Sequence, residues 1–163
     1  MTVRRICFVC TGNIVRSPLA ENLFLDIAGK AGAKYIVSSA GTSDYHAGEP
    51  PDERMRRVAA RHGLVYAGQA RQFQPQDFDR FDLILALDKD NQRNLERLAE
   101  VTGHKVCIRL LREFDPLGGS GVSVPDPYYE GMEGFEEVYE IIARSCKGLL
   151  EHLEGSQDGA ELR

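Results

Sequence analysis

The chain has 163 residues, 42% of them hydrophobic, and a formal net charge of −5, which suits one domain with a single buried core. The acidic balance argues against the basic surface that nucleic-acid-binding proteins use. No run of about 18 apolar residues predicts a membrane span, and the apolar stretch near the amino terminus is too short for a signal peptide.

The first predicted element is a strand that ends in a tight loop. Residues 6–9 form a short apolar run typical of a buried strand, and Cys10 follows at its carboxyl end. Gly12 and Asn13 come next, and both residue types tolerate a left-handed backbone. Cys10 is therefore expected at the base of a sharply turning loop.

A helix is expected to begin directly after this loop. Ser17 followed by Pro18 is typical of an N-cap and a first-turn proline, and apolar residues continue at helical spacing to about residue 30. The free N–H groups of a helix amino terminus and the planar guanidinium of Arg16 both suit a phosphate. The same positive field is expected to favour the nucleophilic thiolate of Cys10. Residues 10–17 thus predict hydrolysis of a phosphate ester through a cysteinyl phosphate.

The rest of the chain alternates strands with helices, which predicts an α/β fold. We expect a single domain with an open, parallel, four-stranded sheet and helices on both faces, spanning residues 1–154, and a flexible tail at residues 155–163. The remaining elements are expected as strands at residues 35–38, 82–87 and 106–108, helices at residues 52–62 and 88–101, and a long amphipathic helix marked by Phe135, Val138, Tyr139, Ile142, Cys146, Leu149 and Leu153.

Three segments are expected to meet at one rim of this sheet. Ligands of parallel sheets bind beyond the carboxyl ends of the strands, where Cys10, residues 39–45 and Asp88 fall. Asp88 is also placed to cap the helix that follows it. By contrast, a run of arginines on the helix at residues 52–62 is interpreted as a solvated face, and it comprises Arg54, Arg56, Arg57 and Arg61.

Asp126 is the candidate general acid. A departing oxygen needs a proton, which a positioned carboxylic acid can donate. Pro125 and Pro127 flank Asp126 and are expected to hold it in an extended conformation. Taken alone, a Pro-Asp-Pro segment is more typical of a structural turn.

Two separated motifs make a family resemblance specific. Residues 9–18, Val-Cys-Thr-Gly-Asn-Ile-Val-Arg-Ser-Pro, resemble the signature of the low-molecular-weight protein tyrosine phosphatases. Residues 126–129, Asp-Pro-Tyr-Tyr, resemble a second element of that family. The resemblance spans about residues 4 to 153 and implies a Rossmann-like fold of the phosphotyrosine phosphatase I type. It also implies a hydrolase with no metal and no cofactor.

The resemblance assigns roles residue by residue. It implies that Cys10 is the nucleophile, that Arg16 binds the phosphate, and that Asp126 protonates the leaving oxygen and then activates water. It implies that Asn13 holds the loop backbone and that Ser17 stabilises the sulfur. It also implies supporting roles around the site for Arg71, Asp88 and Asn91. The phosphate-binding residues would be Thr11, Gly12, Asn13, Ile14, Val15, Arg16 and Ser17, and the substrate pocket would be lined by Ile14, Tyr45, Tyr128 and Tyr129.

The chain departs from the family at two positions. Val15 stands where many members have a second cysteine, so the protective disulfide that such members form after oxidation is not available to Cys10. Gly68 stands where some members have a histidine in the hydrogen-bond network of the loop. Hydrolysis should survive the first change, because Val15 supplies the same backbone amide. The second change implies that the hydrogen-bond network is built differently.

Three alternative functions are weighed against the phosphatase. An arsenate reductase needs resolving cysteines, and residues 80–100 contain none. Related protein-arginine phosphatases tend to carry threonine where this chain has Ile14. A phosphotyrosine-binding module without activity would not need both Cys10 and Asp126.

The expected partners are a phosphotyrosine-containing protein or a small aryl phosphate, without nucleic acid or membrane. The sequence leaves open the oligomeric state and any control by phosphorylation of Tyr128 or Tyr129. Cysteines without a metal-ligand pattern predict a reducing cytoplasm. Three of them, Cys7, Cys107 and Cys146, are expected to lie in the core.

Overall fold

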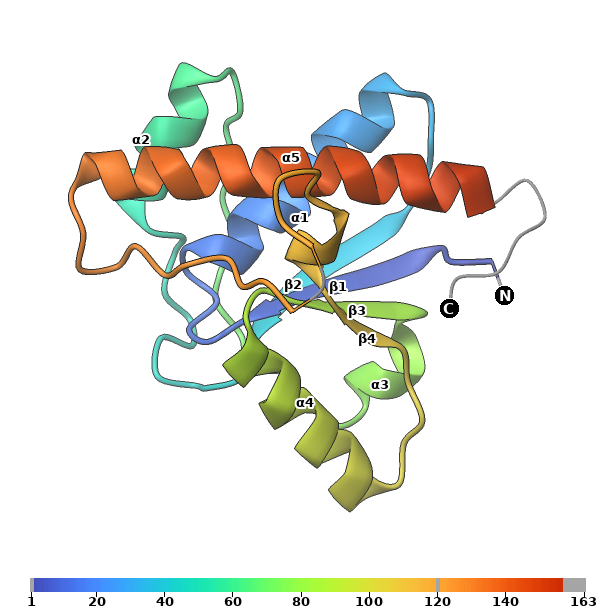
Figure 1. The fold of residues 1–163 in the computed structure, drawn as a ribbon. Helices are drawn as coiled ribbons and strands as arrows, with labels where there is room; N and C mark the ends of the chain where they lie inside the picture. Colours follow the sequence, from blue (N-terminus) through green and yellow to red (C-terminus); the bar gives the residue numbers. More distant parts are fainter. Residues whose placement is uncertain (1, 120, 157–163) are drawn as a thin grey trace.

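Strand β1 (Arg5–Cys10) lies inside a four-stranded parallel sheet, as the computed structural model of residues 2–119 and 121–156 shows (Figure 1). The strand order is β2-β1-β3-β4, and every neighbouring pair is parallel. The predicted parallel sheet is therefore confirmed. Its other strands are β2 (Ile36–Gly41), β3 (Leu83–Ala86) and β4 (Ile108–Leu110).

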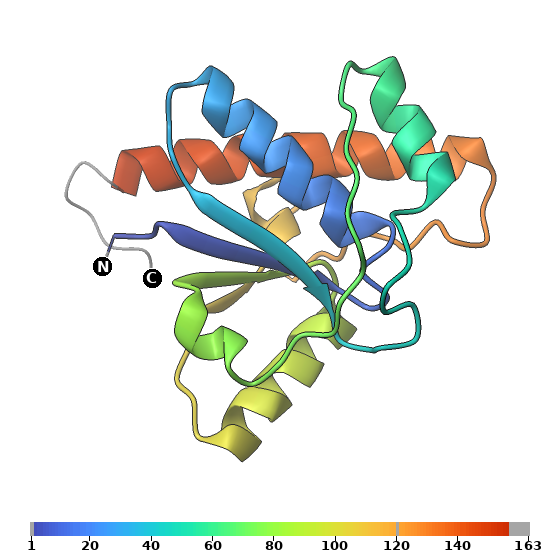
Figure 2. The same ribbon diagram turned by 180° about the vertical axis from the view of Figure 1, so that it is seen from behind.

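Helices cover both faces of the sheet, also as predicted (Figures 1 and 2). The longest helix, α5, packs against α1, α2 and the short 3-10 helix η1 on one face, while α4 contacts β3 and β4 on the other. The helices are α1 (Arg16–Lys30), α2 (Glu53–Arg61), α3 (Asp77–Arg80), α4 (Lys89–Thr102), η1 (Leu111–Phe114) and α5 (Met132–Ser156).

The alternation of side chains along β1 divides the core into two clusters. Phe8 and Cys10 belong to the cluster under α1 and α5, whereas Cys7 and Val9 belong to the cluster under α4. Cys7 and Cys10 thus lie on opposite faces of the sheet, as residues three apart in a strand must. Cys7 and Cys146 are fully buried, as expected.

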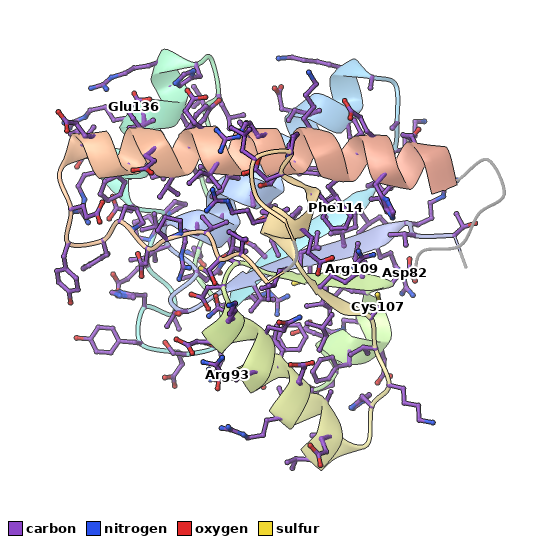
Figure 3. All side chains as sticks on the ribbon, in the orientation of Figure 1. Asp82, Arg93, Cys107, Arg109, Phe114 and Glu136 are labelled. Carbon is purple, nitrogen blue, oxygen red and sulfur yellow. The ribbon has the colours of Figure 1, made fainter. Side chains whose placement is uncertain are left out.

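Cys107, labelled in Figure 3, is only half-buried and packs against the edge of the core, where full burial in the core was expected. The strand predicted at residues 106–108 begins two residues later, because pairing with β3 starts where Ile108 meets Ile84. Cys107 therefore lies in the connection from α4, outside the strand.

The end of α5 differs from the expected domain boundary. The helix continues through Ser156, two residues beyond residue 154, so the tail expected at residues 155–163 does not begin at residue 155. Residues 157–163 lie outside the described residues. Within the described ranges no helix has both the length and the apolar character needed to cross a membrane.

Candidate active site

Residues 10–17, here called the phosphate-binding loop, connect β1 to α1 around one left-handed residue. Asn13 has a φ of 58°, the region that asparagine tolerates better than most side chains. Its Nδ2 donates to Ser17 Oγ at 2.8 Å and to Ser39 Oγ at 3.0 Å, and its Oδ1 accepts from the backbone N–H of Arg71 at 2.9 Å. These three hydrogen bonds hold the loop in its turn.

The sulfur of Cys10 lies at the base of this loop. Cys10 is 2% exposed, its Sγ is 3.0 Å from Ser17 Oγ, and it accepts from the backbone N–H of Asn13 at 3.3 Å. Because the side-chain amide of Asn13 donates to Ser17 Oγ, the hydroxyl proton is left for the sulfur, 3.0 Å away, or for the carbonyl of Ala40, 3.4 Å away. Two donors are thus placed to stabilise a thiolate.

Ser17 does not cap helix α1, which corrects one expectation. The helix begins at Arg16, and its N-cap is Val15, without a side-chain cap hydrogen bond. The Ser17 hydroxyl lies beside Cys10 instead. The first backbone N–H groups of α1, next to the loop, therefore have no capping side chain.

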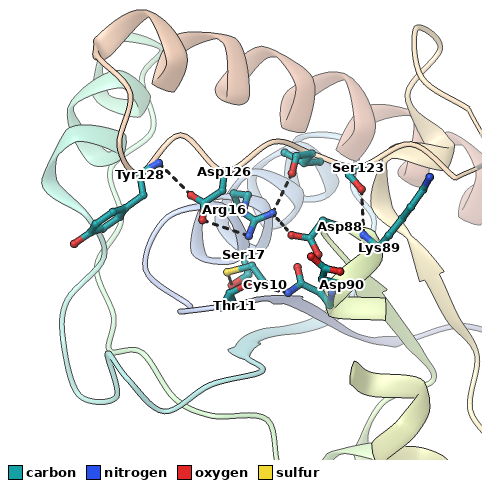
Figure 4. A network of polar contacts seen from close by, with 12 residues as sticks. Cys10, Thr11, Arg16, Ser17, Asp88, Lys89, Asp90, Ser123, Asp126 and Tyr128 are labelled. Carbon is teal, nitrogen blue, oxygen red and sulfur yellow. Dashed lines mark hydrogen bonds and ion pairs between the residues drawn. The ribbon is translucent and has the colours of Figure 1, made fainter. Parts of the chain in front are cut away.

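Arg16 is buried beneath the loop and held by two acceptors (Figure 4). Its Nη1 donates to Asp88 Oδ2 at 2.8 Å and to the carbonyl of Val124 at 3.0 Å. Burial alone would lower the pKa of Arg16, but the sulfur of Cys10 and the carboxylate of Asp88 together raise it above its ordinary value. The guanidinium is therefore a permanent, fixed cation.

Asp88 has both of the roles expected for it. Its Oδ2 accepts from Arg16, and its Oδ1 accepts from the backbone N–H of Asn91 at 2.7 Å, which caps α4. The side chain of Asn91 in turn donates to Thr11 Oγ1 at 3.1 Å. Helix α4 is thus joined to the loop at two points.

The carboxyl group of Asp126 lies beside Arg16, although the two residues are far apart in the sequence. Its side chain is 50% exposed, with Oδ2 3.7 Å from Arg16 Nη2. Its Oδ1 accepts from the backbone N–H of Tyr128 at 3.1 Å (Figure 4). Asp126 is therefore half in solvent and next to the cation.

A cavity of about 350 Å³ brings the predicted catalytic and pocket residues together. Asn13 and Ser17, although part of the loop, do not line the cavity. Ser43 and His46, which the sequence did not single out, do line it. The predicted residues that line it are Cys10, Thr11, Gly12, Ile14, Val15, Arg16, Tyr45, Asp126, Tyr128 and Tyr129.

Aromatic rings form the outer wall of this cavity. Tyr45 and Tyr129 are 83% and 96% exposed, while Tyr128 is half-buried. The ring of Tyr128 meets that of Tyr129 edge-on, with centroids 5.1 Å apart, and His46 meets Tyr45 in the same way at 4.8 Å. A flat apolar group could lie between these rings.

Glycines allow the wall and the loop to approach each other. A Cβ at Gly12 would lie 2.9 Å from Cδ2 of His46, and a Cβ at Gly41 would lie 2.5 Å from the carbonyl oxygen of Thr11. Since real Cβ atoms do not come so close to other atoms, a side chain at Gly41 would displace the loop backbone, whereas one at Gly12 would displace the ring of His46.

The network behind the loop closes without a side chain at position 68. Ser39 Oγ receives the bond from Asn13 and donates to Glu21 Oε1 at 2.6 Å. Burial raises the pKa of Glu21, although Ser39 and Arg71 oppose the shift. Gly68, Glu21 and Arg71 line a separate small cavity behind the loop.

The arginines of α2 are not uniformly solvated, contrary to expectation. Arg57 and Arg61 are exposed, but Arg54 and Arg56 are half-buried and donate to backbone carbonyls. Arg54 Nη1 reaches the carbonyl of Tyr128 at 2.9 Å. Sequence patterns gave no signal for this contact, because its acceptor is a backbone atom 74 residues away.

One group of possible metal ligands occurs in the described part of the chain, away from this cavity. The ligand atoms of His62, Glu136 and Glu140, at the ends of α2 and α5 that face each other, lie within 4.8 Å of one another. None of the three lines the cavity that contains Cys10.

Residues 5–158 match the family described as low molecular weight phosphotyrosine protein phosphatase. A low molecular weight protein-tyrosine-phosphatase from Streptomyces coelicolor is 47% identical over 149 residues, which cover 90% of this chain and 91% of the relative.

Solved structures agree with this similarity. A protein tyrosine phosphatase from Entamoeba histolytica, with Hepes in its active site, has a TM-score of 0.85 and 35% identity and covers 94% of this chain and 99% of its own. A Drosophila arginine phosphatase has a TM-score of 0.83 and 32% identity, and the match covers 90% of this chain and 96% of that structure's chain.

Proposed function

This chain belongs to the low-molecular-weight phosphotyrosine protein phosphatases, and on that premise we propose that Cys10, Arg16 and Asp126 hydrolyse an aryl phosphate in two in-line steps. The observation that carries this assignment is that a buried sulfur, a fixed guanidinium and a half-exposed carboxyl group line one cavity.

In the first step the phosphate binds to the amides of the phosphate-binding loop and to Arg16. The Cys10 thiolate attacks phosphorus, and the bond from phosphorus to the aryl oxygen breaks. The carboxylic acid of Asp126 gives its proton to that oxygen, so a phenol leaves. Positioning and charge stabilisation by the loop and Arg16 supply most of the catalysis.

In the second step water attacks the cysteinyl phosphate. The carboxylate of Asp126 takes a proton from the water, the sulfur–phosphorus bond breaks, and inorganic phosphate is released. The returning thiolate is stabilised by the Ser17 hydroxyl and the Asn13 N–H, which lie 3.0 Å and 3.3 Å from the sulfur.

Phosphotyrosine in a protein, or a small aryl phosphate, is the proposed substrate. The aromatic wall of Tyr45, Tyr128 and Tyr129 and the apolar side chain of Ile14 support an aryl leaving group. A protein-arginine phosphatase is the second candidate, since a structure so named has nearly the same TM-score as the tyrosine phosphatase.

We also propose that the single phosphatase domain expected over residues 1–154 extends to the end of α5 at Ser156, which the family match to residues 5–158 supports. A cytoplasmic location is proposed from the described cysteines, which are all free thiols and so suit a reducing compartment.

The direct test assays an aryl phosphate, phosphoarginine and arsenate with the wild type, Cys10→Ser and Asp126→Ala. We expect turnover of the aryl phosphate, none after Cys10→Ser, and a decrease of about 10²–10⁴-fold after Asp126→Ala, the usual contribution of acid catalysis. Activity that survives Cys10→Ser would contradict the mechanism, and preferential turnover of phosphoarginine would favour the second candidate.

A further inference from the structure

The first turn of α2 contacts both halves of the active site. The backbone N–H of Asp52, the N-cap of α2, donates to the carbonyl of Ile14 in the phosphate-binding loop at 2.7 Å. Two residues later, Nη1 of Arg54 donates to the carbonyl of Tyr128 at 2.9 Å. Asp52 and Arg54 thus connect the loop with residues 125–130, here called the acid segment, in addition to the direct contacts from Arg16 to Val124 and Asp126.

Arg54 is held in one orientation by Asp52. Oδ1 of Asp52 accepts from the backbone N–H and from Nε of Arg54, at 2.8 Å and 3.2 Å, and Oδ2 accepts from Nη2 at 2.8 Å. Burial alone would raise the pKa of Asp52, but the hydrogen bonds from Arg54 outweigh it and lower that pKa. The forked contact fixes the plane of the guanidinium.

Aromatic rings restrict the same guanidinium further. Its Cζ lies 5.1 Å from the ring centroid of Tyr128 and 4.6 Å from that of Phe135, at the start of α5. Arg54 thus contacts the acid segment through a backbone carbonyl and through a ring.

Asp126 itself has few contacts that could fix it. Its carboxyl group is 50% exposed, and its short-range partner is the backbone N–H of Tyr128, while Arg16 lies 3.7 Å away. The position of the carboxyl group therefore depends on the backbone at Tyr128, the residue that Arg54 binds.

We propose that Asp52 and Arg54 form a clamp that sets the distance between the phosphate-binding loop and the acid segment. This inference rests on the proposed function. Arg54 is then a positioning residue, which acts on the reaction through Asp126 and does not touch the substrate. Its loss should impair proton donation more than phosphate binding.

The test uses Arg54→Met, which keeps a stem of similar length but removes the donors. kcat/KM reports the step in which the phenol leaves, and it is measured with phosphotyrosine and with p-nitrophenyl phosphate, whose weakly basic leaving group needs little protonation. We expect kcat/KM to fall about 10- to 100-fold for phosphotyrosine, the range that a misplaced catalytic group produces, and much less for p-nitrophenyl phosphate.

A double-mutant cycle separates positioning from general damage to the fold. If Arg54 acts through Asp126, then Arg54→Met should change kcat/KM for phosphotyrosine less than about 2-fold in an Asp126→Ala background. Equal losses in both backgrounds, or equal losses with both substrates, would overturn the proposal. Arg54→Lys keeps the charge without the fork and is expected to resemble Arg54→Met.

Arg57→Met is the matched control, because Arg57 lies on the same helix, is exposed and pairs with Glu53. Hydrogen exchange of residues 125–130 gives a readout that does not require activity. It should accelerate in Arg54→Met and not in Arg57→Met, and unchanged exchange would reject the clamp. If Asp126→Ala left phosphotyrosine turnover intact, the acid role would fail while the exchange result would still decide the clamp.

Discussion

Asn13 shows how far the active site depends on one side chain. Its left-handed backbone turns the loop, and its amide joins the loop to Ser17, to Ser39 and to the backbone at Arg71. A glycine would allow the same φ without strain, but it would not orient the hydroxyl that faces Cys10.

Asn13→Gly and Asn13→Ala should therefore differ in stability, but both should weaken the binding of phosphate. A left-handed alanine costs about 1–2 kcal/mol, which exceeds the roughly 0.4–1 kcal/mol that alanine gains over glycine through the unfolded chain. Urea unfolding should find Asn13→Ala the less stable variant, and both should bind inorganic phosphate, as a competitive inhibitor, more weakly than the wild type. An alanine variant as stable as the glycine variant would mean that the loop relaxes.

The sequence predicted the site residues that lie close together in the chain and missed those that reach the site from elsewhere. Cys10, Arg16 and Ser17 share one loop, so their residue types and spacing carried the prediction. His46 and Arg54 were missed because they meet the site through ring contacts and a backbone carbonyl, which leave no pattern in the sequence. Ser17 was assigned both a cap and a role at the sulfur, and its hydroxyl lies at the sulfur.

At the scale of elements, α5 and η1 pack so closely that one residue of α5 must be a glycine. A Cβ at Gly148 would overlap the backbone carbonyl of Phe114 at the end of η1. Seven residues later in the same helix, near its C-terminal end, a Cβ at Gly155 would meet nothing within 4 Å.

Alanine at these two glycines should therefore have opposite effects. Helix propensity favours alanine by about 1 kcal/mol in a helix interior, but at Gly148 the overlap should outweigh it and destabilise the protein by about 1–3 kcal/mol, as overpacking does. Gly155→Ala should be neutral or slightly stabilising. Thermal unfolding of both variants checks this, and a stable Gly148→Ala would show that η1 can move away from α5.

Long periodic elements were predictable, whereas short ones were not. The apolar runs of β1 and β3 and the apolar stripe of α5 identified them, because their burial repeats over several residues. Helix α3 and η1 have four residues each, too few to show a period, and both were missed. The three-residue strand β4 was placed two residues early, since its pairing with β3 fixes its start.

At the scale of the whole molecule, buried or half-buried carboxylates join distant elements. Oδ2 of Asp82 accepts from the backbone N–H groups of Arg4 and Arg5, which ties the start of β3 to that of β1 (Figure 3 labels Asp82). Asp115, after η1, accepts from Arg144 on α5 at 2.9 Å. In both cases burial alone would raise the pKa, but hydrogen bonds to the charged form lower it.

These lowered pKa values predict loss of stability in acid. An aspartate whose folded pKa lies below its unfolded value of about 3.9 stabilises the fold above that value, and the contribution disappears as the pH falls through the folded pKa. The free energy of unfolding in urea should therefore be steady near neutrality and fall below about pH 4.

Asp115→Asn should be less stable at pH 7 by about 1.5–3 kcal/mol, the usual contribution of hydrogen bonds to a charged group, because its partners Arg112 and Arg144 remain partly exposed to water. It should also lose less stability on acidification than the wild type. Asp90→Asn, at an exposed aspartate whose partner is Arg93, is the control and should follow the wild type. Parallel pH curves for Asp115→Asn and the wild type would contradict the assignment.

The order of the strands could not be predicted from the sequence, although the alternation of elements predicted their parallel arrangement. No sequence pattern in residues 35–38 or 82–87 indicates that these two strands lie on opposite sides of β1. That order places the end of β1 between two strands, because Cys10 pairs with Gly41 of β2 and Val9 pairs with Ala86 of β3.

The near-complete exposure of Tyr45 and Tyr129 has an evolutionary consequence. Cys10 and Arg16 lie in one unbroken stretch at the end of β1, whereas these two rings come from separate surface segments and contribute little to folding. Substitution of either tyrosine by another residue should change the free energy of unfolding very little. Selection, natural or in the laboratory, could then change which phosphorylated molecules this scaffold accepts while the reaction stays the same.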